Sequence, residues 1–134
     1  MHGTSSLRDL EAVIARSEAS IEAIPDGHPN RAKLFGNLGV YLGQRFEKTE
    51  NLQDLEAAIA RSEAALKATP EDHLDRARWL NNLGNYWGSR YKRSGNLQDL
   101  EAAIEKSDAA VEAIPEDHPD RATWLSNLAN HLGS

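Results

Sequence analysis

The chain has 134 residues, of which 40% are hydrophobic and 27% are charged, as in an ordinary folded domain and unlike a disordered chain. Its formal net charge of -6 offers no basic surface to phosphate groups, so we expect neither nucleic acid nor a membrane as partner. The chain has no cysteine, which excludes disulfides and thiolate chemistry. That composition is compatible with a reducing compartment, and we expect a cytoplasmic location.

The same pattern of residues recurs every 45 positions along the chain. Leu7, Leu52 and Leu97 open three similar segments, and residues 52–89 match residues 97–134 at 26 of 38 positions. Chance does not produce so many identities. The chain is therefore a tandem repeat in which each period is one structural unit.

Each period begins with a helical segment that we name a B helix. Apolar residues recur there at helical spacing, which predicts B helices at residues 7–24, 52–69 and 97–114. A short polar residue stands before each of them as the expected N-cap: Ser6, Asn51 and Asn96. A proline follows each segment and stops the helix. We expect residues 1–6 to be a leader outside the fold.

A second helical segment, the A helix, follows an acidic turn in each period. We expect A helices at residues 29–49, 74–94 and 119–133. A histidine precedes each of them as the expected N-cap: His28, His73 and His118. Gly95 suits the left-handed conformation that ends the second A helix, whereas Glu50 stands at that place in the first copy. We therefore expect a looser turn at Glu50.

The middle A helix has an apolar stripe that predicts its core face. Its members share one side of a helix of 3.6 residues per turn: Ala77, Leu80, Leu83, Gly84, Trp87 and Tyr91. Trp79, Tyr86 and Arg90 are expected at the flanks of this stripe. Gly39 and Gly84 lie one period apart within A helices, where glycine costs about 1 kcal/mol relative to alanine. A cost repeated at the same place predicts close approach of a neighbouring helix.

Read from the A helix onward, the order of residues resembles the tetratricopeptide repeat. The residues that carry the resemblance are Asn82-Leu83-Gly84, Trp87, Gly95-Asn96, Ala103-Ile104, Ala110 and Pro115. The period is longer than the usual 34 residues or so, and is similar to a long-period subclass of fungal and bacterial multi-repeat signalling proteins. The resemblance implies an all-α fold with six helices, an α-solenoid of antiparallel helix pairs wound into a right-handed superhelix. A single array over residues 7–134 would hold a leading B helix (7–24), repeats 29–69 and 74–114, and a final A helix (119–133).

The resemblance also implies a non-catalytic scaffold whose concave face, lined by A helices, binds a peptide or a neighbouring protein domain. The candidate peptide-binding residues are Asn37, Val40, Tyr41, Asn82, Asn85, Tyr86, Asn127, Asn130 and His131. Side-chain amides can bond the backbone of an extended peptide while tyrosines supply apolar surface, which would make a sequence-tolerant reader. In the alternative interpretation, the asparagines at the first place of each set bond backbone groups between repeats.

Several more specific functions fit the sequence less well. A clamp for C-terminal carboxylates in this family needs lysine and asparagine beside the first Leu-Gly pair, where Gly36 and Val40 stand. The three repeated histidines lie in successive repeats, too far apart to converge on one metal ion. Arginines recur at positions 31, 76 and 121, and we expect them to pair with nearby carboxylates rather than to form a phosphate-binding ladder. The paired carboxylates, such as Glu71 and Asp72, lie in turns where burial cannot raise their pKa. We expect no enzymatic activity, no cofactor and no metal.

The two end helices predict an alternative function, self-association. Terminal repeats normally carry a polar outer face, but both end helices keep apolar residues. The candidate self-association residues are Leu10, Ile14 and Ile21 in the first B helix, and Leu125, Leu128 and Leu132 in the last A helix. Two complementary apolar faces would form a head-to-tail homo-oligomer.

Overall fold

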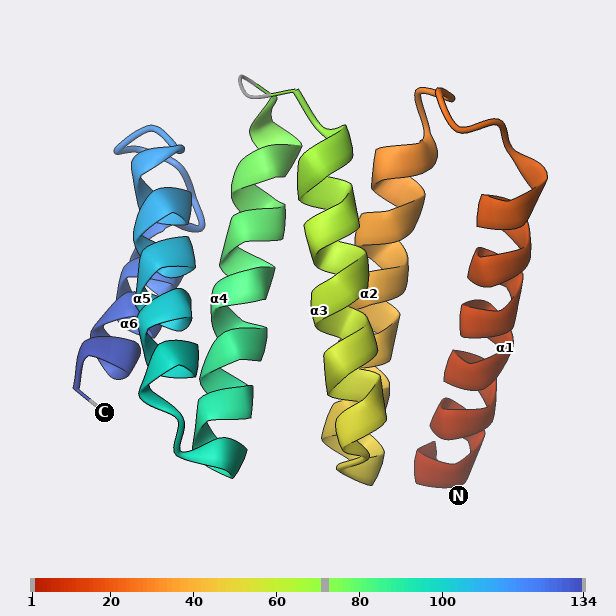
Figure 1. Ribbon diagram of the computed structural model, residues 1–134, viewed down its shortest axis with the longest axis horizontal. Helices are drawn as coiled ribbons and strands as arrows, with labels where there is room; N and C mark the ends of the chain where they lie inside the picture. Colours follow the sequence, from red (N-terminus) through yellow and green to blue (C-terminus); the bar gives the residue numbers. More distant parts are fainter. Residues whose placement is uncertain (1, 71–72, 134) are drawn as a thin grey trace. The chain divides into compact units, whose positions relative to one another are not determined.

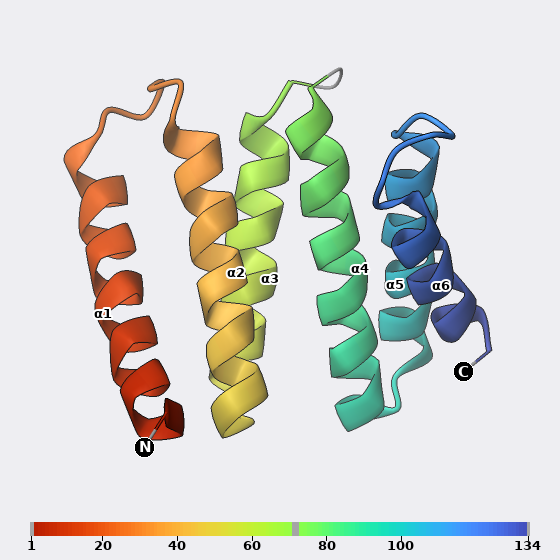
Figure 2. The same cartoon turned by 180° about the vertical axis from the view of Figure 1, so that it is seen from behind.

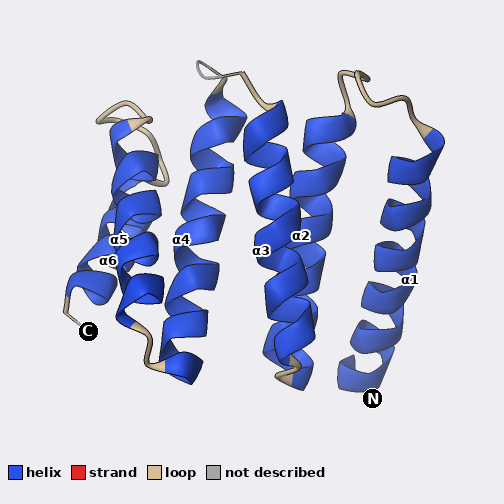
Figure 3. Ribbon diagram, viewed as in Figure 1, coloured by secondary structure: helices blue, strands red, loops and turns tan. Residues whose placement is uncertain are grey.

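The computed structural model describes residues 2–70 and 73–133, with side chains described from Leu7 onward. These residues form six helices and no strand (Figures 1 and 3). The helices are α1 (His2–Ala23), α2 (Arg31–Thr49), α3 (Leu52–Ala68), α4 (Leu74–Ser94), α5 (Leu97–Glu112) and α6 (Arg121–Leu132). The predicted all-α fold with six helices in adjacent pairs is confirmed. The chain forms two compact units, residues 1–68 with α1 to α3 and residues 69–134 with α4 to α6.

The first unit is built on α2, which packs against both α1 and α3. Figure 1 shows α2 and α3 as a close antiparallel pair, with α1 on the other side of α2 and farther from it. Leu38 of α2 and Leu55 of α3 are almost completely buried in this unit. The α2–α3 pair joins an A helix to the B helix that follows it, which we name an A–B contact. The α1–α2 pair joins a B helix to the A helix that follows it, which we name a B–A contact.

The second unit is built on α5, which packs against both α4 and α6. Figure 2, which shows the molecule from behind, places α6 in front of α5. Leu83 and Ala103 are buried between α4 and α5, and Trp124 is the buried residue of α6. The α4–α5 pair repeats the A–B contact of the first unit, and the α5–α6 pair repeats its B–A contact. A smaller contact joins α4 directly to α6.

The repeated glycines lie where the helices of an A–B contact come closest, as predicted. A Cβ atom added to Gly39 would lie 2.7 Å from Ser62 Oγ of α3 and 3.3 Å from the carbonyl oxygen of Ala58. A Cβ atom added to Gly84 would overlap Ser107 Oγ of α5. The helices can approach this closely only because these positions carry no side chain.

The core face of α4 differs from the predicted stripe at its two tryptophans. Trp79, expected at the flank, is 1% exposed, whereas Trp87, expected in the core, is only half-buried. The indole of Trp79 reaches back to Thr69 and donates its N–H to Thr69 Oγ1 at 3.1 Å. This hydrogen bond satisfies the indole N–H, so the ring of Trp79 can be buried although it lies at the edge of the apolar stripe.

The predicted histidine N-cap is confirmed at His73 of α4, whereas α2 and α6 begin two residues later than expected, with Asn30 and Asp120 at their N-cap positions. Nδ1 of His28, His73 and His118 accepts a hydrogen bond from the backbone N–H two residues later, at 3.0 Å in each copy. Asn51 and Asn96 cap their B helices in the same way through Oδ1, at 2.9 Å. Each side chain satisfies one of the backbone donors that a helix start leaves unbonded.

Two predictions about helix ends are wrong. The helix α1 starts at His2, so Ser6 lies inside it and is not its N-cap, because no proline in residues 2–6 stops the helix. Glu50 adopts the same left-handed conformation as Gly95, with φ of 58° against 69°, and its N–H bonds the carbonyl of Phe46 at 2.6 Å. That turn is closed rather than loose. The side chain of Ser6 and residues Glu71 and Asp72 lie outside the described part of the chain.

The repeated arginines hold the B–A connection of each unit. Arg31 Nη1 donates to the carbonyls of Ile21 and Ile24 at the end of α1, at 3.3 and 3.4 Å. Arg121 does the same at the end of α5. The expected carboxylate pairing is only a weaker addition, since Arg31 lies 3.6 Å from a fully exposed Asp26. The guanidinium therefore satisfies carbonyls that the helix end leaves unbonded.

Candidate functional site

Most of the predicted peptide-binding residues lie on α4 and α6 in the second unit. Asn82, Asn85 and Tyr86 of α4 are half-buried, as are Asn127 and His131 of α6, while Asn130 is exposed. Because α4 contacts α6, these two sets of side chains lie on neighbouring helices. The remaining candidates, Asn37, Val40 and Tyr41, are half-buried on α2 in the first unit.

The asparagines of this group keep their bonding capacity. Within the described part of the chain, the side chains of Asn37, Asn82, Asn85 and Asn127 make no hydrogen bond to other protein groups. The alternative interpretation, that they bond backbone groups between repeats, therefore receives no support. A half-buried amide without a protein partner can still donate to and accept from a ligand.

The ring of His131 packs closely against α4. Its ring fills the space above Gly88 of α4, where an added Cβ atom would lie 2.6 Å from its Cε1. Its Nε2 is buried and has no hydrogen-bond partner among the described residues. Burial of the ring, with a smaller contribution from the charge of Lys92, lowers the pKa of His131. The lowered pKa favours the neutral form of the imidazole.

In the first unit, Tyr41 lines a cleft between α1 and α2 that the sequence did not predict. The cleft has a volume of about 460 Å³. Leu10, Val13 and Tyr41 form its apolar part, and the remaining lining residues are polar or charged: Asp9, Gln44, Glu47 and Lys48. These polar residues are all exposed, so they form the rim around an apolar floor.

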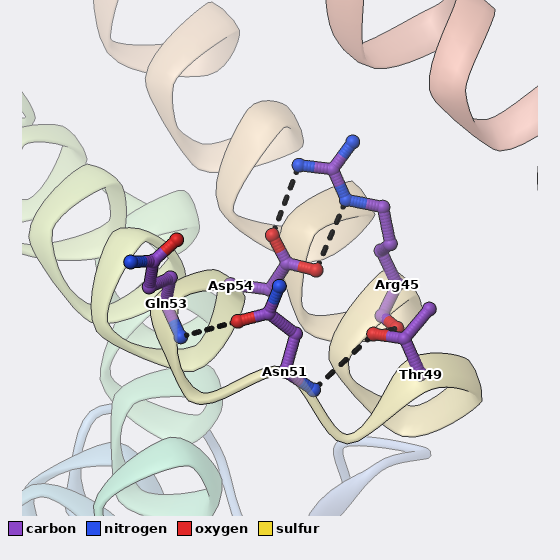
Figure 4. A network of polar contacts seen from close by, with 5 residues as sticks. All are labelled: Arg45, Thr49, Asn51, Gln53 and Asp54. Carbon is purple, nitrogen blue, oxygen red and sulfur yellow. Dashed lines mark hydrogen bonds and ion pairs between the residues drawn. The ribbon is translucent and has the colours of Figure 1, made fainter.

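A polar network fixes the A–B contact of the first unit at its turn (Figure 4). Arg45 of α2 binds the carboxylate of Asp54 of α3 through two nitrogens, Nε at 3.0 Å and Nη2 at 2.9 Å. This hydrogen-bonded carboxylate raises the pKa of Arg45. Thr49 Oγ1 donates to the Arg45 carbonyl and accepts from the N–H of Asn51. A bidentate pair of this kind sets both distance and orientation.

The same positions recur in the second unit with a different arrangement. Asp99 accepts from Ser94 Oγ at 2.8 Å, and Arg90 Nη1 lies 3.6 Å from the same carboxylate. The recurrence of this arginine and aspartate one period apart was a signal in the sequence that could have revealed the network. In each unit, this network positions the A helix on the B helix that follows it in the chain.

The structure places the predicted self-association residues in two different environments. Leu10, Ile14 and Ile21 are buried, because α1 packs against α2, so they do not form the open face expected on the first helix. On α6, by contrast, Leu125 is 42% exposed and Leu132 is 62% exposed, while Leu128 is half-buried. Of the expected self-association surface, only the part on α6 is exposed to solvent.

Comparison with known proteins gives the family. A family model described as Tetratricopeptide repeat matches residues 31–75 and 76–120, which is more than half of the chain. The chain belongs to the tetratricopeptide repeat family. Both matched segments begin at an A-helix arginine and span one 45-residue period, so the long-period tetratricopeptide repeat predicted from the sequence is confirmed. No curated protein matches the chain.

Tetratricopeptide repeats generally mediate protein–protein interactions, and the family is a non-catalytic scaffold repeat. Within the described residues, no cluster of histidine and carboxylate side chains is placed to hold a metal ion. None of the helices that these residues form is long and apolar enough to cross a membrane.

Proposed function

We propose that the chain is a scaffold that binds an extended peptide, or such a segment of a neighbouring domain, through the amide side chains of its A helices. The observation that carries this proposal is the set of half-buried asparagines without a protein hydrogen-bond partner in the described residues, at repeated positions of α2, α4 and α6. None of these amide atoms is fully buried without a partner, so each can still reach a ligand that takes the place of water. Their repetition favours a binding role.

The spacing of these amides suits a peptide backbone. Each carboxamide holds a donor and an acceptor side by side, so it can bond the N–H and the C=O of one residue of an extended peptide, whatever the side chain of that residue is. Packed helices lie about 8–10 Å apart, and an extended peptide advances about 3.3 Å per residue. A peptide that crosses from Asn82 on α4 to Asn127 on α6 therefore spans about three residues.

The test begins with selection of binders from a random dodecapeptide display library on the wild-type chain. The affinity of the selected peptides is then measured by calorimetry against Asn82→Ala and Asn127→Ala. Each change removes about one net hydrogen bond of roughly 1 kcal/mol, so each should weaken binding about fivefold. The matched control is Asn30→Ala, because Asn30 is exposed and its side chain makes no cap bond.

Two results would overturn the proposal. The first is a library that yields no binder above background. The second is a set of binders whose affinity is the same for the wild type and for the double variant at positions 82 and 127. Thermal melts of every variant are recorded beside the affinities, so that loss of folding is separated from loss of binding.

Self-association is a second candidate function, and one observation favours it: the exposure of Leu125 and Leu132 on α6. Large apolar side chains gathered on one surface often mark a protein interface.

The single array over residues 7–134 and the cytoplasmic location also stay predictions.

A further inference from the structure

The geometry points to a head-to-tail contact in which α6 of one copy fills the cleft between α1 and α2 of a second copy. This inference rests on the second candidate function, self-association, and does not depend on peptide binding. It follows from comparison of the end helices with their counterparts inside the chain. The counterpart of any residue lies one or two 45-residue periods away.

The helix α6 presents an open stripe that is covered in the other A helices. Ala122, Leu125, Ala129 and Leu132 are all exposed. Their counterparts on α4 are Ala77, Leu80, Gly84 and Trp87, of which the first three are buried and the last is half-buried. The B helix α5 packs on α4 there, with Ser107 directly against Gly84. The stripe on α6 is therefore the surface that receives a B helix in the A–B contact.

The helix α1 presents the matching surface. In α5, the residues of the A–B contact are Ala103, Ser107 and Ala110, with exposures of 0%, 1% and 0%. Their counterparts on α1 are Val13, Ser17 and Ser20, of which the first two are half-buried and the third is exposed. The B–A face of α1 is already covered by α2. Its A–B face is open, and it lacks only an A helix.

The cleft lies at the place where that A helix would sit. It is bounded by Val13 on the open face of α1 and by Tyr41 on α2. Tyr41 is the counterpart of His131, whose ring packs on Gly88 of the preceding A helix. The counterpart of Gly88 on α6 is Gly133, so Tyr41 would pack on Gly133 of the second copy. Each bounding surface of the cleft thus matches one surface of α6.

The fit is looser than in the internal contacts, which predicts a reversible association. Ala129 stands in α6 where Gly84 stands in α4, and an added methyl group there would overlap the serine opposite. Asp9 on the rim is exposed, whereas its counterpart Asp99 is buried beside Arg90 and Ser94. Small voids or overlaps at a helix contact weaken it without changing its register. The contact should therefore form at high chain concentration and dissociate on dilution.

The experiment is sedimentation velocity on the whole chain, from about 1 μM to about 1 mM, with two blocking variants. Leu132→Glu places a charge on the α6 stripe, and Val13→Glu places one in the cleft. Each variant alone should stay monomeric, because each has lost one half of the contact. Mixed together, they should form a dimer of twice the chain mass of 14.8 kDa and nothing larger. The mixture retains one intact α6 stripe and one intact cleft, as a heterologous contact requires.

Three further variants complete the design. Leu97→Glu is the matched control, since Leu97 is 66% exposed on α5, outside both surfaces, and it should associate like the wild type. Ala129→Gly should tighten association at least tenfold, because it restores the close approach seen at Gly84. Ser17→Glu, which places a charge on the same open face of α1, replaces Val13→Glu if circular dichroism shows that Val13→Glu is unfolded.

Several outcomes would overturn the inference. One is a wild-type chain that remains monomeric at every concentration. Another is a mixture of the two blocking variants in which no dimer forms, or a Leu132→Glu variant that associates as the wild type does. Peptide affinity measured on the monomeric Leu132→Glu variant tests the scaffold proposal separately, so failure of one proposal leaves the other standing.

Discussion

The closest helix contact of the second unit offers a direct test of the packing argument through Gly84→Ala. The change has two opposed effects. Alanine favours the helix over glycine by about 1 kcal/mol. The new methyl group, however, overlaps Ser107 Oγ and approaches two backbone atoms of α5, Ser107 N at 3.1 Å and Ala103 O at 3.2 Å.

The contact with α5 should outweigh the gain in helix propensity. Overpacking of a closely packed core costs about 1–3 kcal/mol, so the net effect is a loss of about 1 kcal/mol. The midpoint of thermal unfolding should fall by about 4 °C. Circular dichroism at the helical signal measures the midpoint, and urea unfolding measures the free energy.

A second change separates the two effects. Ser107 is 1% exposed and its Oγ has no hydrogen-bond partner in the described part of the chain. Ser107→Ala should therefore stabilise the chain, since a buried unsatisfied hydroxyl costs about 1 kcal/mol or more. With the hydroxyl gone, Gly84→Ala should become neutral or stabilising, which gives a coupling energy of about 1–2 kcal/mol.

The control is Gly27→Ala, because a Cβ atom at Gly27 meets no atom within 4 Å. Its effect should be within about 0.5 kcal/mol of the wild type. The reasoning would be refuted if Gly84→Ala gave the full helix-propensity gain in both backgrounds, with no coupling to Ser107. Such a result would mean that α4 and α5 can separate at no cost.

Three further predictions concern single residues. Trp79→Ala should lower the free energy of unfolding by about 3–5 kcal/mol, whereas Trp87→Phe should change it by less than about 1 kcal/mol, both measured by urea unfolding. Asp54→Asn should lower the same quantity by about 2 kcal/mol, because Arg45 loses a charged hydrogen-bond partner, and an unchanged urea midpoint would contradict this. The pKa of His131 is lowered in the folded chain, so the unfolded chain takes up this proton first as the pH falls below about 6.5. Stability should therefore decrease on acidification, and the thermal midpoint of the wild type should fall more between about pH 7.5 and about pH 5.5 than that of His131→Phe.

Local chemistry explains what the sequence could predict. The 45-residue period, the two helix types and the histidine caps follow from residue spacing and from side chains that bond their own backbone neighbours. The glycines at positions 39 and 84 could be assigned to close helix contacts because each carries a repeated cost in helix propensity. The period, the helix types and the caps depend only on residues close in sequence, whereas the glycine contacts could be predicted because their signal, a repeated glycine within a helix, is itself local.

Features that depend on neighbouring helices could not be predicted in the same way. A helical wheel gives the angle of Trp79 and Trp87 but not the extent to which other elements cover each ring. The left-handed Glu50 contradicts its residue preference, because the hydrogen bond from its N–H to Phe46 closes the turn. The cleft at Tyr41 depends on the distance between α1 and α2, and that distance is not written in either helix alone.

The hydrogen bonds of Arg31 bear on where such a chain could accept an inserted segment. The guanidinium bonds carbonyls at the end of α1 from the start of α2, so a contact besides the intervening turn holds these two helix ends together. Asp26 is fully exposed in that turn, and a Cβ atom added to Gly27 would meet no atom within 4 Å. New segments could be inserted there, as exposed turns without packing generally allow. A binding loop of another specificity could therefore be added at this position without remaking the helices around it.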